Sequence, residues 1–168
     1  DFASDKQPIG RIEISLLEHE RQATKNLSGY YIFTDVENGD YTVQVSSDYY
    51  FDEEKEVTVS DSDTPDLEEL VEEITLKPVP FYPFSPGATL IKGMVKKEED
   101  EEENPVSGAT VKVLEKDIQN QTTEKGEFVL YFTGLTEDDI VTIDKKRFIK
   151  GSDGADSTKL TLEVTYDD

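Results

Sequence analysis

Cysteine and tryptophan are absent from this sequence of 168 residues, and histidine occurs only once, as His19. Without cysteine, the chain forms neither disulfides nor zinc–thiolate sites. Ser-His-Asp catalysis would depend on His19 alone, and its neighbours Glu18, Glu20 and Arg21 predict an exposed strand end or turn instead. No nucleophile-elbow, Walker or H-E-x-x-H motif occurs. The sequence therefore predicts a chain that is not an enzyme.

Positive charge is scarce as well, because the sequence has 17 Lys and Arg residues against 39 Asp and Glu residues, which gives a net charge of −22. Binding to nucleic acid or to an anionic membrane surface needs clustered basic residues. No apolar run approaches the ~20 residues of a membrane-spanning helix. We therefore expect no nucleic-acid partner and no membrane insertion. The excess of acidic residues favours solubility and the attraction of divalent cations. Adaptation to high salt is an alternative explanation for this excess.

The chain repeats itself at an offset of 97 residues. Residues 7–18 align with residues 104–115, and SGYYIF (28–33) aligns with KGEFVL (125–130). A constant offset over roughly forty residues indicates two copies of one module. We assign module 1 to residues 1–79, a linker to 80–87 and module 2 to 88–168.

Each copy has the pattern of a small antiparallel β-domain. Apolar residues alternate along short runs separated by Gly, Asn and Asp, which predicts strands with one buried face. The predicted buried residues are Ile12, Ile14, Leu16, Tyr31, Phe33, Tyr41, Val43, Val45, Val57 and Val59 in module 1, and Val111, Val113, Phe128, Leu130, Val141, Ile143, Leu160, Leu162 and Val164 in module 2. This pattern favours two tandem antiparallel β-sandwiches.

Three further elements follow from local patterns. Residues 26–45 predict two strands joined by a tight loop, with Asn38-Gly39 as the turn signal. Residues 64–73 predict a short helix with Pro65 at its first position. The Pro-rich linker predicts an extended spacer whose aromatic residues pack between the modules.

Module 1 lacks one strand that module 2 possesses. Residues 89–95 predict the first strand of module 2, and the counterpart in module 1 would precede residue 1. Either the strand has been trimmed or another segment fills the gap. An open sheet edge pairs readily with other strands, which predicts an edge-strand dimer through module 1.

The motifs PVSGATVKV and TTEKGEFVL in module 2, and SGYYIF and NGDYTVQV in module 1, resemble those of carboxypeptidase regulatory-like domains. These are transthyretin-like seven-stranded β-sandwiches, and Cna-B-like surface modules share their motifs. The segment TEDDIVTI departs from the family's G-x-Y pattern, and Arg11-Ile12 replaces its Gly-Ala. The resemblance implies an Ig-like/transthyretin-like fold and a non-catalytic accessory role in secreted or surface proteins.

Two kinds of residue are candidates for a binding site. The acidic run at residues 96–104 and the Gly- and Asp-rich segment at 151–157 offer oxygen ligands for Ca²⁺, although solvated loops have the same composition. The candidate calcium ligands are Glu101, Glu102, Glu103, Asp153 and Asp156. No other cofactor is expected.

Tyr49 and Tyr50 are the second kind of candidate. Adjacent strand residues face opposite sides, so at least one aromatic in DYYFDEE (48–54) is expected to be exposed and able to stack on a sugar or a peptide. Alternatively, Tyr50 covers an edge of the core.

These patterns together predict a structural or interaction segment of a secreted or cell-surface protein, acting as a spacer or binding platform. A calcium-stabilised module, or one that binds a glycan or peptide, is the alternative. A third possibility is the accessory domain of a separate enzyme.

Overall fold

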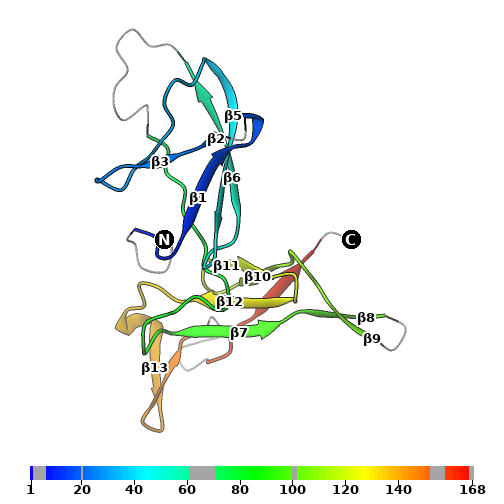
Figure 1. The fold of residues 1–168 in the computed structure, drawn as a ribbon. Coiled ribbons are helices and arrows are strands. Elements are labelled where there is room, and N and C mark those ends of the chain that lie inside the picture. The colour runs from blue at the N-terminus through cyan, green and yellow to red at the C-terminus, as the bar shows by residue number, and fades with distance from the viewer. Residues whose placement is uncertain (2–6, 20, 61–70, 100–101, 152–157, 167–168) are drawn as a thin grey trace. The chain divides into compact units, whose positions relative to one another are not determined.

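The computed structural model describes residues 1, 7–19, 21–60, 71–99, 102–151 and 158–166. The chain is all-β and built from antiparallel strands, as its alternating pattern predicts (Figure 1), and the described residues also contain two short 3₁₀ turns, η1 and η3. It divides into two compact units, Asp1–Tyr82 and Pro83–Asp168, which we call unit 1 and unit 2. In the part of the chain that the structure describes, no helix is long and apolar enough to cross a bilayer.

Unit 1 contains a four-stranded sheet in the order β2-β1-β5-β6 and a separate pair, β3-β4. The strands are β1 (Ile12–Leu16), β2 (Arg21–Gln22), β3 (Thr24–Lys25), β4 (Tyr31–Ile32), β5 (Gly39–Ser47) and β6 (Glu53–Val59), and η1 (Leu17–His19) follows β1. The buried residues are Leu16, Tyr41, Val43 and Val45 from the sheet, and Tyr50, Leu76, Val79 and Tyr82 from the segments that follow it. The alternating residues of β5 thus form the centre of this core.

The predicted hairpin at residues 26–45 is wrong in its pairing. β4 pairs with β3, whereas β5 pairs with β1 and β6. A turn at Asn26–Tyr30 directs β4 back onto β3, and Gly29 adopts a φ of +92° there. Gly39 is the first residue of β5. The nine residues of β5 gain more pairing from two long neighbours than two-residue β4 offers.

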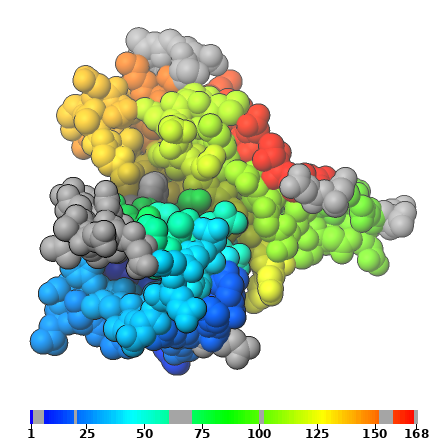
Figure 2. All heavy atoms as spheres, turned by 90° about the horizontal axis from the view of Figure 1, so that it is seen from above, coloured from blue at the N-terminus to red at the C-terminus, as the bar shows by residue number. Residues whose placement is uncertain are grey.

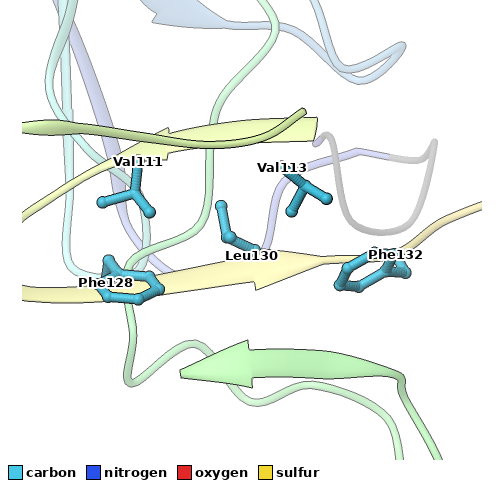
Figure 3. Packing of buried hydrophobic residues seen from close by; sticks show 5 residues of the cluster. All are labelled: Val111, Val113, Phe128, Leu130 and Phe132. Atoms are coloured by element: carbon cyan, nitrogen blue, oxygen red, sulfur yellow. The ribbon is translucent and has the colours of Figure 1, made fainter. Parts of the chain in front are cut away.

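Unit 2 contains a three-stranded sheet in the order β11-β10-β15 and three strand pairs, β12-β7, β13-β14 and β8-β9. The strands are β7 (Leu90–Met94), β8 (Lys96–Glu99), β9 (Glu102–Pro105), β10 (Thr110–Val113), β11 (Ile118–Gln121), β12 (Glu127–Tyr131), β13 (Ile140–Ile143), β14 (Lys146–Ile149) and β15 (Leu162–Thr165), with η3 (Glu137–Asp139) before β13. Val111 and Val113 from β10 face Phe128, Leu130 and Phe132 in the core (Figure 3).

Part of the predicted buried face of module 2 is exposed. Ile143, Leu162 and Val164 are 37%, 41% and 42% exposed. β15 is the outer strand of its sheet, and β13 belongs to a two-stranded hairpin, so neither has neighbours enough to cover its apolar residues. Alternation located these strands correctly but did not show that they lie at edges.

The acidic run at residues 96–104 provides two strands, β8 and β9. They pair antiparallel, and their hairpin projects from the rest of unit 2 (Figure 1, Figure 2). The helix predicted at residues 64–73 falls mostly outside the described residues, and residues 71–73 lie in no helix or strand.

Strand register follows the 97-residue offset in one hairpin of each unit. Ser15 pairs with Gln22 in unit 1, and Lys112 pairs with Gln119 in unit 2, so both partners shift by the same offset. The turn that follows is also shared. Asn26 N–H donates to Tyr30 C=O at 2.9 Å, and Thr123 N–H donates to Glu127 C=O at 2.9 Å. The two units therefore contain the same hairpin and turn at equivalent positions.

Two aromatic residues of the linker each contact a tyrosine of their own unit. The Tyr82 ring lies 5.5 Å from the Tyr50 ring in unit 1. The Phe84 ring lies 5.2 Å from the Tyr131 ring in unit 2. Phe81 is 64% exposed.

Candidate functional site

Tyr50 is a buried core residue, only 2% exposed. Its hydroxyl accepts a hydrogen bond of 3.0 Å from Ile9 N–H, and its backbone forms a bridge with Pro78. Burial raises the pKa of Tyr50 to about 12. The ring therefore covers an edge of the core and offers no face to a sugar or peptide.

Tyr49 is half-buried, and its ring lies against Gly10. A Cβ at residue 10 would lie 2.6 Å from Cδ2 of Tyr49, and Gly10 has a φ of +78°. Only glycine fits under this ring without strain. Of the two tyrosines that the sequence singled out, Tyr49 alone retains a partly exposed ring, and ligand binding there stays a prediction.

Two of the five candidate calcium ligands have described positions. Glu102 and Glu103 are successive residues of β9, so their side chains point to opposite faces of the hairpin. Glu103 accepts a hydrogen bond of 2.6 Å from Lys96 Nζ, and this ammonium lowers the pKa of Glu103. Glu101, Asp153 and Asp156 lie outside the described residues.

The acidic hairpin does not gather its carboxylates within the part of the chain that the structure describes. No group of three or more His, Cys, Asp or Glu side chains there is arranged to hold a metal ion. Strand alternation separates neighbouring carboxylates, and Lys97 lies 2.9 Å from Glu99. Calcium binding by the full set of predicted ligands stays a prediction.

His19 is exposed at the end of η1, and its ring centroid lies 5.7 Å from that of Tyr41. The adjacent Glu18 accepts a hydrogen bond of 2.8 Å from Thr42 N–H. Backbone hydrogen bonds lower the pKa of Glu18. The carboxylate therefore joins the turn after β1 to β5.

Sequence reasoning missed the polar contact between Lys116 and Asp139. Lys116 Nζ lies 2.5 Å from Asp139 Oδ1, while the N–H and hydroxyl of Thr136 donate to Oδ2 at 3.0 and 2.9 Å. The Lys116 ammonium and these donors hold the pKa of Asp139 well below its usual range. The spacing Thr136-x-x-Asp139 is a capping signature, so the Thr–Asp part could have been found. Its lysine partner could not, because it comes from the β10–β11 turn.

Two buried polar residues join the strands of unit 2. Asn120 Nδ2 donates to Val129 C=O at 3.0 Å, which connects β11 with β12. The Thr122 hydroxyl donates to Val106 C=O at 2.7 Å and accepts from Ala109 N–H at 2.9 Å. Among the described residues, no buried side-chain nitrogen or oxygen lacks a partner. These polar groups act in the fold, because their hydrogen bonds are made within the chain.

Comparisons of the chain with protein-family models, with curated proteins and with solved structures return no match. The resemblance to carboxypeptidase regulatory-like domains therefore rests on the motifs alone.

Proposed function

We propose that the chain is a non-catalytic structural or interaction segment of a secreted or cell-surface protein. In this proposal, two tandem transthyretin-like β-sandwich modules form a spacer or binding platform. The observation that carries the proposal is the residue-for-residue repetition of one hairpin and turn at an offset of 97 residues. Tandem copies of one folded unit lengthen a chain while each copy keeps its own core.

The use of the polar side chains supports this proposal. Tyr50, Asn120, Thr122 and Asp139 all bond to groups on other segments of their own unit. Such contacts hold strands and turns in position. The proposed function of these contacts is to keep each module rigid. A rigid module holds an attached or bound group at a defined position.

The location can be tested by labelling intact cells that express the parent protein with a membrane-impermeant, lysine-reactive reagent. The 14 lysines of the chain provide many reactive positions. We expect these lysines to be labelled on intact cells as strongly as those of a known surface protein. Labelling only after lysis would place the chain inside the cell and overturn the proposal.

A second candidate is a peptide-binding module. One observation favours it: β12 of unit 2 pairs with β7, whereas among the described residues its counterpart β4 pairs with β3 alone.

A further inference from the structure

Two of the four asparagines of the chain stand in the pattern Asn-x-Ser/Thr, in which x is not proline. They are Asn26, in the tripeptide Asn-Leu-Ser, and Asn120, in the tripeptide Asn-Gln-Thr. This pattern is the acceptor signal for N-linked glycans in secreted proteins, where it is used on surface loops. The surroundings of the two asparagines therefore decide which of them can carry a glycan.

Asn26 begins an exposed turn that joins β3 to β4. The turn lies at the outer end of this strand pair, which extends away from the four-stranded sheet of unit 1 (Figure 1). Asn26 and Ser28 are both exposed, and Leu27 between them is fully exposed. The amide and the hydroxyl of the acceptor signal thus belong to exposed residues of one turn.

The hydrogen bonds of the turn fix the orientation of the Asn26 side chain. Asn26 Oδ1 accepts from Tyr30 N–H at 2.9 Å, and the Asn26 N–H donates to Tyr30 C=O at 2.9 Å. Because the amide oxygen points at Tyr30, Nδ2 points away from that contact. An N-linked sugar replaces one hydrogen on Nδ2 and leaves Oδ1 able to accept. The turn therefore keeps both hydrogen bonds when a glycan is attached.

Asn120 carries the same signal in the opposite environment. It is 7% exposed, and its Nδ2 donates to Val129 C=O at 3.0 Å. Thr122, which supplies the hydroxyl of the signal, is 3% exposed and bonds to Val106 C=O and Ala109 N–H. A sugar on Nδ2 would stand between Asn120 and the Val129 carbonyl, in the close-packed interior. Folded unit 2 therefore excludes a glycan at this position.

Apolar side chains beside Asn26 give a glycan a physical role. Leu27 is fully exposed, and Tyr30 and Ile32 are 55% and 42% exposed, on the same turn and on β4. Large apolar side chains that gather on one exposed hairpin favour association with other chains. A glycan is bulky and solubilising, so one attached at Asn26 would keep other chains away from this hairpin.

We propose that Asn26 is an acceptor site for an N-linked glycan and that burial keeps Asn120 inaccessible to the same modification. Nδ2 of Asn26 attacks the anomeric carbon of a sugar carried on a lipid phosphate. The carbon–nitrogen bond forms while the bond from that carbon to the phosphate oxygen breaks. The lipid phosphate leaves with the bonding electrons, and Nδ2 loses one proton. This site deepens the proposed function and rests on it, because N-glycans are attached to secreted proteins.

The test directs the full chain through the secretory pathway of a eukaryotic cell with a cleavable secretion signal. Peptide N-glycosidase converts each glycosylated asparagine of the secreted, folded chain to aspartate. Trypsin then places Asn26 and Asn120 on different peptides, because Lys55 and Lys116 lie between them. Fragment spectra distinguish Asn26 from Asn38, which lies on the same peptide. We expect conversion at Asn26 and none at Asn120.

Four substitutions form a matched set. Asn26→Gln removes the acceptor and Ser28→Ala removes only the hydroxyl, so each variant is expected to lose the whole glycan mass. Ser28→Thr keeps a hydroxyl and is expected to keep the glycan. Asn38→Gln is the control and is expected to keep it too, because Asn38 is exposed but has Asp40 where the signal needs Ser or Thr.

Two results would overturn the proposal. One is a secreted chain without a glycan on Asn26, from cells that glycosylate a reference protein. The other is an occupancy of Asn120 equal to that of Asn26, because the fold would then not select the site. Neither result bears on the surface labelling, since the added signal imposes secretion. Labelling of the parent protein only after lysis would overturn the proposed location, whatever the occupancy of Asn26 in these cells.

Discussion

Single polar side chains join segments of this protein that lie far apart in sequence. The Tyr50 hydroxyl connects to the backbone of Ile9, and the Asp139 carboxylate connects to Lys116. Each contact is made by a group whose partner comes from another loop. Their loss therefore loosens two segments at once.

Replacing Tyr50 by Phe leaves the part-buried Ile9 N–H without its acceptor. The net contribution of a hydrogen bond of this kind is about 0.5–1.5 kcal/mol, so we expect unit 1 of Tyr50→Phe to unfold at lower urea concentration. Tyr49→Phe is the matched control, because its hydroxyl forms no hydrogen bond with any residue that the structure describes. Equal unfolding midpoints for the two variants would contradict the structural role of Tyr50.

The Lys116–Asp139 contact predicts a pH dependence. Because the pKa of Asp139 is lowered in the folded protein, its ionised form stabilises the fold above the unfolded-state pKa of about 3.9. This stabilisation is lost as the pH falls through the lower folded-state pKa. We expect Asp139→Asn to melt several degrees below the parent chain at neutral pH, with a difference that shrinks below about pH 4.

Asp117→Asn is the control for this variant, because Asp117 is fully exposed and lies 3.7 Å from Lys112. It should change the melting temperature little, since exposed ion pairs contribute little. A melting difference for Asp139→Asn that did not change with pH would show that the carboxylate charge is unimportant.

At the scale of elements, the same turn occurs at residues 26–30 of unit 1 and 123–127 of unit 2, with different neighbours. Both copies place a glycine with positive φ before the second strand. A Cβ on Gly126 would lie 2.4 Å from the Val95 carbonyl oxygen, whereas the described atoms nearest to a Cβ on Gly29 belong to the flexible side chain of Gln7. The turn of unit 2 therefore requires glycine more strictly than the turn of unit 1, because Val95, directly after β7, lies against Gly126.

This difference predicts unequal costs for the same substitution. Gly29→Ala carries the left-handed backbone penalty of about 1–2 kcal/mol. Gly126→Ala carries that penalty together with a backbone clash, so we expect it to lower the stability of its unit by more. Urea unfolding of the two variants measures both costs, and equal costs would argue against β7 as the cause.

The acidic hairpin β8–β9 places Glu98 opposite Glu103 and Glu99 opposite Glu102. Like charges directly opposite each other weaken a strand pair, and Lys96 offsets part of this repulsion. We therefore expect any cation that screens this repulsion to stabilise the hairpin.

Melting curves in EDTA and in millimolar calcium, at ionic strength fixed with sodium chloride, separate screening from specific binding. We expect no calcium-specific rise in melting temperature, because Lys96 and Lys97 already pair with glutamates in the described part of the hairpin. A rise of several degrees would instead support a calcium-stabilised module using residues 96–104 and 151–157.

At the scale of the whole molecule, the same module is completed to different degrees in the two units. Val111 of unit 2 is fully buried, whereas its counterpart Ile14 in unit 1 is half-buried. The central strands β1 and β10 also take different second neighbours, β5 in one unit and β15 in the other. The two units therefore share the hairpin and the turn but differ in which further strands complete their sheets.

This divergence predicts two unfolding steps, with unit 1 unfolding first. Incomplete burial lowers local stability, which amide hydrogen exchange reports. We expect amides in β1 and β4 to exchange faster than those in β10 and β12. A single cooperative transition with uniform protection would show that the lower burial of the described core residues of unit 1 has no energetic consequence.

The sequence by itself determined the antiparallel β character, the 97-residue repeat, the buried residues of β5 and β10, and Phe128 and Leu130 of β12, but not the buried Val129. Those features depend on alternation and on turn residues such as Gly29 and Gly126, which are local properties. Tertiary structure alone decided the pairing partners: β4 lies beside β3, and β15 lies beside β10. It also decided that Tyr50 is buried, because pairing and burial depend on segments distant in sequence, which alternation within one strand does not record.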